Sequence, residues 1–104
     1  MRIRVSSSGS DLKETDVDRI EKDLEKIDRR LGDFREVDAE VRINDNGGTQ
    51  GYSVVLEVNY GRHHVRAKSG HSDLGQAVRG AREEVLRQIN DKSRGGHSSF
   101  AKGR

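Results

Sequence analysis

Arginine and lysine side chains, which bind phosphate groups, are the residues of this sequence best suited to chemistry. Arg79, Arg87 and Arg94 fall within about 80° of arc on a helix that turns about 100° per residue, so they predict a basic ridge. The same spacing also fits weak surface ion pairs, in which Glu83 pairs with Arg79 and Arg87. Phosphate contact and a solvated charged face both stay open as interpretations of this ridge.

Further cations precede and follow this helix. Arg66 and Lys68 alternate with apolar residues, which places them on the exposed side of a predicted strand. Residues 92–104 hold four basic residues, beginning with Lys92, and no acid. We favour phosphate contact for Lys92 and the residues after it, although a basic terminus also complements the helix dipole. For Arg66 and Lys68, protection of an edge strand from aggregation is the commoner use of such charges.

The other polar residues predict neither a metal site nor a catalytic site. His63 and His64 are adjacent, so on a strand they point to opposite faces and cannot simply chelate one ion. Asp45 begins a segment like a calcium loop, but Leu56 occupies the place of the required glutamate, so we interpret a turn. No phosphate-binding glycine loop or nucleophile with a base stands at a recognisable spacing. We therefore expect no enzyme, no metal, no cofactor and no small-molecule substrate.

Periodic apolar residues predict the elements that position these cations. Residues 1–6, 36–44, 52–58 and 65–69 alternate between apolar and polar side chains and are predicted strands. Residues 15–31, and a segment that Ser72 or Asp73 can cap, repeat at steps of three and four and are predicted helices. The two apolar stripes consist of Val17, Ile20, Leu24, Ile27 and Leu31 in the first helix, and of Leu74, Ala77, Val78, Ala81, Val85 and Ile89 in the second.

The element order predicts an α+β fold, β-α-β-β-β-α. The first crossover requires a parallel, right-handed connection, whereas the later strands can pair antiparallel through short turns. We expect a four-stranded sheet with two helices packed on one face. The other face would be open to solvent, with its basic residues gathered on the first and fourth strands.

The length and composition of the chain limit the classes of protein to which it could belong. The chain has 104 residues, 30% hydrophobic and 37% charged, which predicts one domain over residues 1–94 and a disordered basic tail over 95–104. It holds no Cys, and its longest apolar run is three residues (54–56), so we expect a cytoplasmic protein with no signal peptide and no contact with a membrane. The first 91 residues carry 16 basic and 18 acidic residues, so binding to nucleic acid would depend on local clusters.

The segment KSGHSDLGQAVRGAREEVLRQI (68–89) resembles the ribosome hibernation promoting factor and ribosome-associated inhibitor family, also called sigma-54 modulation proteins. The shared pattern is a strand that ends in a small residue and Gly, then Asp with a bulky apolar residue, an Ala-Val pair and an Arg-Gln pair. The residues that carry it are Ser69, Gly70, Asp73, Leu74, Ala77, Val78, Arg87 and Gln88. The first predicted helix, which runs into Phe34, also resembles the family's first helix. The likeness spans roughly residues 1–94 and is to a short form of the family.

This resemblance implies a translation inhibitor that binds the rRNA of the small ribosomal subunit in the decoding region. Off the ribosome we expect a monomer. Such binding works through cations on phosphate and through the shape of folded RNA. The candidate RNA-binding residues are Arg66, Lys68, Arg79, Arg87, Lys92 and Arg94. Glu84 and Asp91 depart from the family's basic pattern. They keep open a protein-interaction regulator of the same fold that has lost rRNA binding, while a binder of some other structured RNA is a third hypothesis.

Overall fold

A computed structural model describes residues 1–9, 12–47 and 50–102, with side chains as far as residue 93. Its elements are β1 (Arg2–Ser8), α1 (Glu14–Arg30), β2 (Val37–Asp45), β3 (Tyr52–Tyr60), β4 (His63–His71) and α2 (Leu74–Lys102). The predicted α+β order, β-α-β-β-β-α, is therefore confirmed. Within the described residues, no helix is long and apolar enough to cross a membrane.

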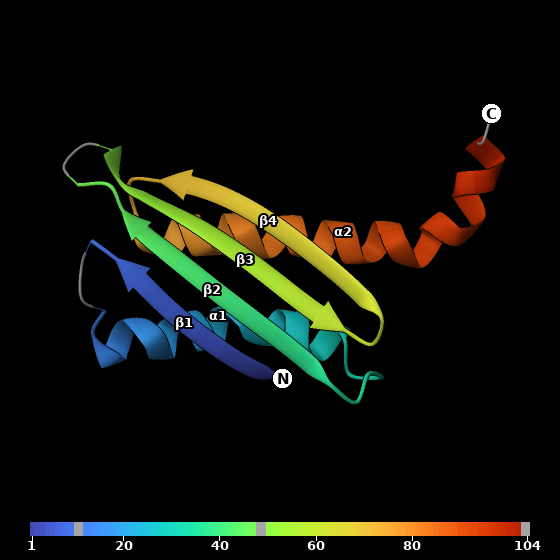
Figure 1. Cartoon of the computed structure of the whole chain (residues 1–104), viewed down its shortest axis with the longest axis horizontal. Helices are drawn as coiled ribbons and strands as arrows, with labels where there is room; N and C mark the ends of the chain where they lie inside the picture. The colour runs from blue at the N-terminus through green and yellow to red at the C-terminus, as the bar shows by residue number, and fades with distance from the viewer. Residues whose placement is uncertain (10–11, 48–49, 103–104) are drawn as a thin grey trace.

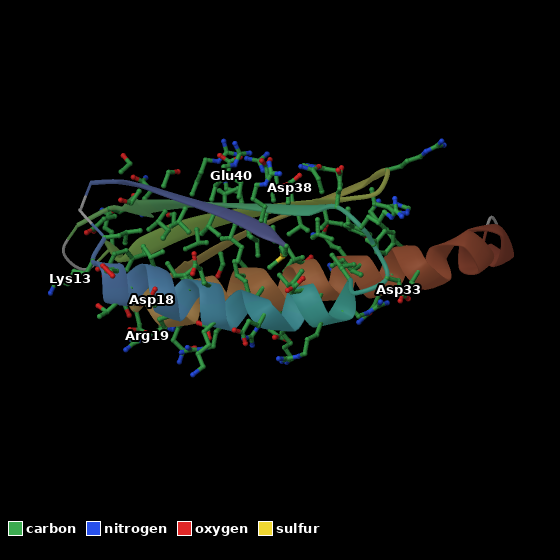
Figure 2. The ribbon with its side chains drawn as sticks, turned by 90° about the horizontal axis from the view of Figure 1, so that it is seen from below. Lys13, Asp18, Arg19, Asp33, Asp38 and Glu40 are labelled. Atoms are coloured by element: carbon green, nitrogen blue, oxygen red, sulfur yellow. The ribbon has the colours of Figure 1, made fainter. Side chains whose placement is uncertain are left out.

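The four strands form one sheet in the order β1-β2-β3-β4. β1 pairs parallel to β2, whereas β2 with β3 and β3 with β4 pair antiparallel. These directions follow from the connections, because α1 links β1 to β2 and short turns link the later strands. Both helices cover the same face of the sheet (Figures 1 and 2). Figure 2 shows Asp38 and Glu40 on the opposite, open face.

The core lies between the sheet and the two helices. Leu24 and Ile27 of α1 and Val85 of α2 are fully buried against the strands. All of the predicted stripe residues are buried except Val17 and Leu74, which are half-buried near the helix starts. The two periodicities therefore identified the packed faces correctly.

Hydrogen bonds at the helix starts set their first residues. In α1, the backbone N–H of Lys13 donates to the Asp16 carboxylate over 3.2 Å, and the helix begins at Glu14, one residue before the predicted start. In α2, the Asp73 carboxylate accepts the N–H of Gln76 over 3.0 Å, as expected of a capping residue. Asp73, one of the two predicted candidates, is thus the cap of α2.

Several predicted boundaries differ from the structure, among them the ends of β4 and α2. β4 does not end at Gly70, because Gly70 pairs with Ser53 and His71 pairs with Tyr52 of β3. The backbone of α2 continues to Lys102, through most of the predicted tail. Disorder of that tail stays a prediction, since it concerns motion in solution. The loop expected over residues 6–11 begins later, because β1 continues to Ser8. This loop and the turn over 45–51 each include positions outside the described residues.

Candidate nucleic-acid interface

The open face of the sheet presents side chains in rows that cross all four strands. One row joins Arg4, Glu40, Glu57 and Arg66, so its two cations are balanced by two carboxylates. The next row joins Ser6, Arg42, Val55 and Lys68 and holds no acid. The row after that, Ser8, Asn44, Ser53 and Gly70, is uncharged. The positive part of this face therefore lies on the side of the row that holds Arg42 and Lys68.

Glu57 neutralises the centre of the open face. Its carboxylate lies 2.9 Å from the Arg42 guanidinium, 3.4 Å from that of Arg66 and 4.0 Å from the His64 ring. The Glu57 side chain is only 22% exposed, so these contacts are partly shielded from solvent. Arg66, one of the predicted RNA-binding residues, thus already has an anionic partner within the protein.

Lys68 differs from Arg66 in its surroundings. It is exposed on the edge strand β4, and it forms no ion pair with any residue that the structure describes. The residues paired across from it and beside it, Val55 and Arg42, carry no negative charge. Lys68 is therefore the predicted sheet cation whose charge is most available to a phosphate.

Arg79 on α2 is drawn towards α1. Its guanidinium lies 3.7 Å from the Asp23 carboxylate, which also lies 4.0 Å from Arg82. The Oδ2 atom of Asp23 is buried and accepts no hydrogen bond, so the nearby arginine charges are its compensation. Arg79 therefore contributes to the contact between α1 and α2, and its side chain is 39% exposed.

Arg87 is held by acids of its own helix. Its guanidinium donates to Glu84 over 3.0 Å and to Asp91 over 3.0 Å. Hydrogen bonds from Arg87, and then from Gln88, hold the pKa of Glu84 below its usual value. The expected pairing of Arg87 with Glu83 is wrong, because Glu83 instead binds Arg82 over 2.7 Å and Lys26 over 3.5 Å. A ladder of surface ion pairs is present, but with these other partners.

Lys92 lies where α2 passes the end of the sheet. Its side chain is exposed and forms no ion pair with a described residue. It lines a small pocket together with Arg30 and Phe34 of the α1 end. The side chain of Arg94 lies outside the described residues, so the predicted ridge of Arg79, Arg87 and Arg94 can be placed only in part.

The predicted cations do not form one patch. Gln88 donates from its amide to the backbone carbonyl of Arg66 over 2.9 Å and so joins α2 to the free edge of β4, whereas Arg87 contacts acids of its own helix. Arg79 lies on the side of α2 that faces α1, and Lys92 lies near the end of α1. Sequence reasoning also missed Arg30, which the Asn90 side chain holds over 2.9 Å. Its position on the first helix gives no signal that α2 will pass beside it.

The three histidines with described side chains, His63, His64 and His71, have different partners. His63 contacts the rings of Phe34 and Tyr60, whereas His64 bonds Asn59 over 2.7 Å on the open face. His71 accepts the backbone N–H of Asp73 over 3.0 Å. Among the described residues, no three metal-ligating side chains are grouped.

The segment after Asp45 is a turn, as interpreted from the sequence. The Asp45 carboxylate accepts the N–H of Gly47 over 2.9 Å, and the N–H of Asn46 donates to the carbonyl of Gly51 over 2.9 Å. The carboxylate is thus used to fix the backbone between β2 and β3.

This chain is similar to known proteins in both sequence and fold. The family described as Sigma 54 modulation protein / S30EA ribosomal protein has a model that matches residues 3–94. The Protein Y N-terminal domain from Thermus thermophilus superposes with a TM-score of 0.76 at 23% identity, over 86% of this chain and 96% of that one. A ribosomal subunit interface protein from Coxiella burnetii superposes with a TM-score of 0.76 at 15% identity, over 89% of this chain and 98% of that one. No curated protein matches this chain.

Proposed function

Because the chain belongs to the Sigma 54 modulation protein / S30EA ribosomal protein family, we propose that it binds the small ribosomal subunit and inhibits translation as a hibernation factor. The observation that carries this proposal is the extent of the family match, which covers the sheet and both helices up to residue 94. The family is one of non-catalytic ribosome-associated regulators, as expected from the lack of a catalytic motif.

The solved relatives support a ribosomal partner. The Coxiella burnetii protein is described as a ribosomal subunit interface protein, and its fold covers 89% of this chain. A partner of that kind would place the protein in the cytoplasm, and production under stress would suit a factor that silences ribosomes.

Contacts to rRNA phosphates would come first from cations without an anionic partner. Of the predicted RNA-binding residues with described side chains, Lys68 on the open sheet face and Lys92 on α2 meet this condition. Arg66, Arg79 and Arg87 would have to exchange an internal carboxylate for a phosphate. Such an exchange gains less binding free energy than a contact made by a free cation, because the internal ion pair is lost. We therefore rank Lys68 and Lys92 above these three arginines.

A specific observation supports the second candidate function, a protein-interaction regulator that has lost rRNA binding. Glu84 and Asp91, the two departures from the family pattern, both bind Arg87 and so neutralise the middle of α2. The ribosomal proposal and this alternative make opposite predictions for binding of the protein to the subunit.

Co-sedimentation with purified small subunits over a salt series tests the proposal. We expect binding at low salt whose affinity falls linearly with salt on a double logarithmic scale, because each phosphate contact releases a counterion. Addition of the protein to a cell-free translation reaction should then lower the yield of product. Absence of the protein from the subunit fraction at low salt would reject the ribosomal proposal and favour the regulator.

A further inference from the structure

A small aromatic pocket opens at the end of α1. Its wall includes Arg30 and Phe34 at the α1 end, Tyr60 and His63 beside the β3–β4 turn, and Lys92 of α2; we name it the aromatic pocket after these residues. The cavity measures about 130 Å³, below the roughly 300–1,000 Å³ of a typical small-molecule site. The pocket is therefore sized for one planar group.

The rings of the pocket leave an apolar surface open to solvent. The Phe34 ring meets Tyr60 edge-on at 5.1 Å and 79°, and meets His63 at 6.3 Å and 90°. Phe34 is 37% exposed, more than any other large hydrophobic residue among those described. Tyr60, by contrast, is only 3% exposed and forms the floor. An open ring set beside a buried one forms a surface on which another ring can stack.

The β3–β4 turn is built around the Phe34 ring. Gly61 has a φ of +59°, and a Cβ atom at this position would lie 3.3 Å from two carbons of the Phe34 ring. Only glycine adopts this conformation readily and leaves that space free. The turn therefore holds the ring at the mouth of the pocket.

The charge around the pocket is positive. The Nε atom of Arg30 donates to the Asn90 side chain over 2.9 Å, a neutral partner that orients the guanidinium without cancelling its charge. Lys92 has no ion pair with a described residue, and no carboxylate lines the pocket. Arg87, by contrast, donates to the carboxylates of Glu84 and Asp91, which neutralise its charge.

From these contacts we infer that the aromatic pocket binds one unpaired nucleobase of RNA. The base stacks on the Phe34 and His63 rings, and the phosphates on either side of it contact Arg30 and Lys92. Aromatic rings with neighbouring cations are the usual means of holding an unstacked base, because every base has a flat face. The inference rests on the proposed function for the source of the RNA, but it concerns a different surface from Lys68.

The test measures binding of two single-stranded RNA probes by fluorescence anisotropy. One probe is a labelled hexa-adenylate, and the other is the same backbone with abasic sites, which keeps the charge and removes the bases. We expect the wild type to bind hexa-adenylate at least about 10-fold more tightly, a difference of about 1.4 kcal/mol. Phe34→Leu should lose this difference, whereas Phe34→Tyr, which keeps a ring, should retain it.

An independent signal comes from Tyr60 itself. The chain has no Trp and two Tyr, so in a Tyr52→Phe variant Tyr60 is the one strong fluorophore. Stacking of a base beside it should quench its emission with hexa-adenylate and leave the emission unchanged with the abasic probe. Retained circular dichroism and melting temperature in Phe34→Leu would show that the loss of binding is not a loss of fold.

Equal affinity for the two probes, equal affinity of Phe34→Leu and wild type, or no binding of hexa-adenylate at low salt would each overturn the inference. Measurement of Phe34→Leu with small subunits separates it from the proposed function. If the variant binds subunits as well as the wild type does, the pocket inference fails and the ribosomal proposal stands. If the wild type binds hexa-adenylate through Phe34 but no subunits, the pocket inference stands and the ribosomal proposal fails.

Discussion

At the scale of residues, the same formal charge has different uses in this chain. Arg87 is fixed between Glu84 and Asp91, and Arg66 shares Glu57 with Arg42 and His64. Lys68 has no such partner among the described residues. Sequence reasoning named all three as candidates, but it favoured edge protection for Arg66 and Lys68 and left phosphate contact open for Arg87. It could not identify Lys68 as the available cation, because the orientation of each side chain towards its carboxylate is set by packing.

Tyr60 gives a pH-dependent prediction at this scale. Burial raises the pKa of its hydroxyl above the usual 10.0, and the positive charge of Arg30 only partly offsets this. The unfolded chain therefore loses the Tyr60 proton first as the pH rises. The contribution of Tyr60 to stability is complete below its unfolded pKa and is lost as the pH rises through its folded pKa.

We therefore expect the melting temperature of the wild type to fall more steeply above about pH 10 than that of Tyr60→Phe. Thermal unfolding followed by circular dichroism from neutral to alkaline pH measures both curves. Parallel curves for the two proteins would contradict the assignment of this pH dependence to Tyr60.

At the scale of elements, polar contacts join α1 and α2. Arg82 is only 15% exposed, donates to the backbone carbonyl of Asp23 over 3.3 Å and pairs with Glu83. Lys26 extends this set of contacts to Glu83. These contacts supplement the apolar packing and fix how α2 lies along α1.

Arg82→Ala should lower the free energy of unfolding by about 1–2 kcal/mol, because it removes shielded contacts between two helices. Arg87→Ala is a matched control on the same helix, and its exposed pairs within α2 should give a clearly smaller loss. Urea denaturation of both variants measures the difference. A loss at Arg87 equal to that at Arg82 would show that the contact between helices has no special weight.

The turn between β2 and β3 offers a second test of an element. Gly51 has a φ of +74°, and a Cβ atom there would lie 2.5 Å from the carbonyl oxygen of His71. Gly47 has a similar φ of +81° but has nothing within 4 Å of the same position. The two glycines thus share a conformation and differ in the space around them.

Gly51→Ala should cost about 2 kcal/mol or more of folding free energy, because the positive φ and the clash with His71 both disfavour alanine. Gly47→Ala should cost about 1 kcal/mol, because only the positive φ disfavours alanine there. Chemical denaturation of both variants gives the two values. Equal losses would mean that the close approach of Gly51 to the end of β4 does not constrain the fold.

Elements were more predictable than their ends or their contacts. Alternation in residues 52–58 and the apolar stripe of α2 are local patterns, and both identified the packed face. The extension of β4 to His71 depends on its pairing with Tyr52, which no local pattern reveals. Phe34, Tyr60 and His63 meet only because α1 ends beside the β3–β4 turn. The glycine at position 61 is the one sequence signal that could have drawn attention to this pocket.

At the scale of the whole molecule, the fold separates its charges by face. One face of the sheet is covered by helices, and the other is open (Figure 2). On the open face, Glu57 neutralises the centre, and Lys68 at the edge forms no ion pair with a described residue. A chain with a formal net charge of only +2 can bind RNA if such local arrangements, and not bulk charge, provide the contacts. We therefore propose that the available cations, and not all cations, bind the small subunit.

The most direct test compares Lys68→Gln with Arg87→Gln in equilibrium binding to purified small subunits over a salt series. Both variants remove one positive charge, so bulk electrostatics is matched between them. We predict that Lys68→Gln weakens binding about 3- to 10-fold and makes the salt slope shallower by about 1, whereas Arg87→Gln leaves the affinity within about 2-fold. Equal losses in the two variants, or no binding of the wild type at low salt, would contradict the account.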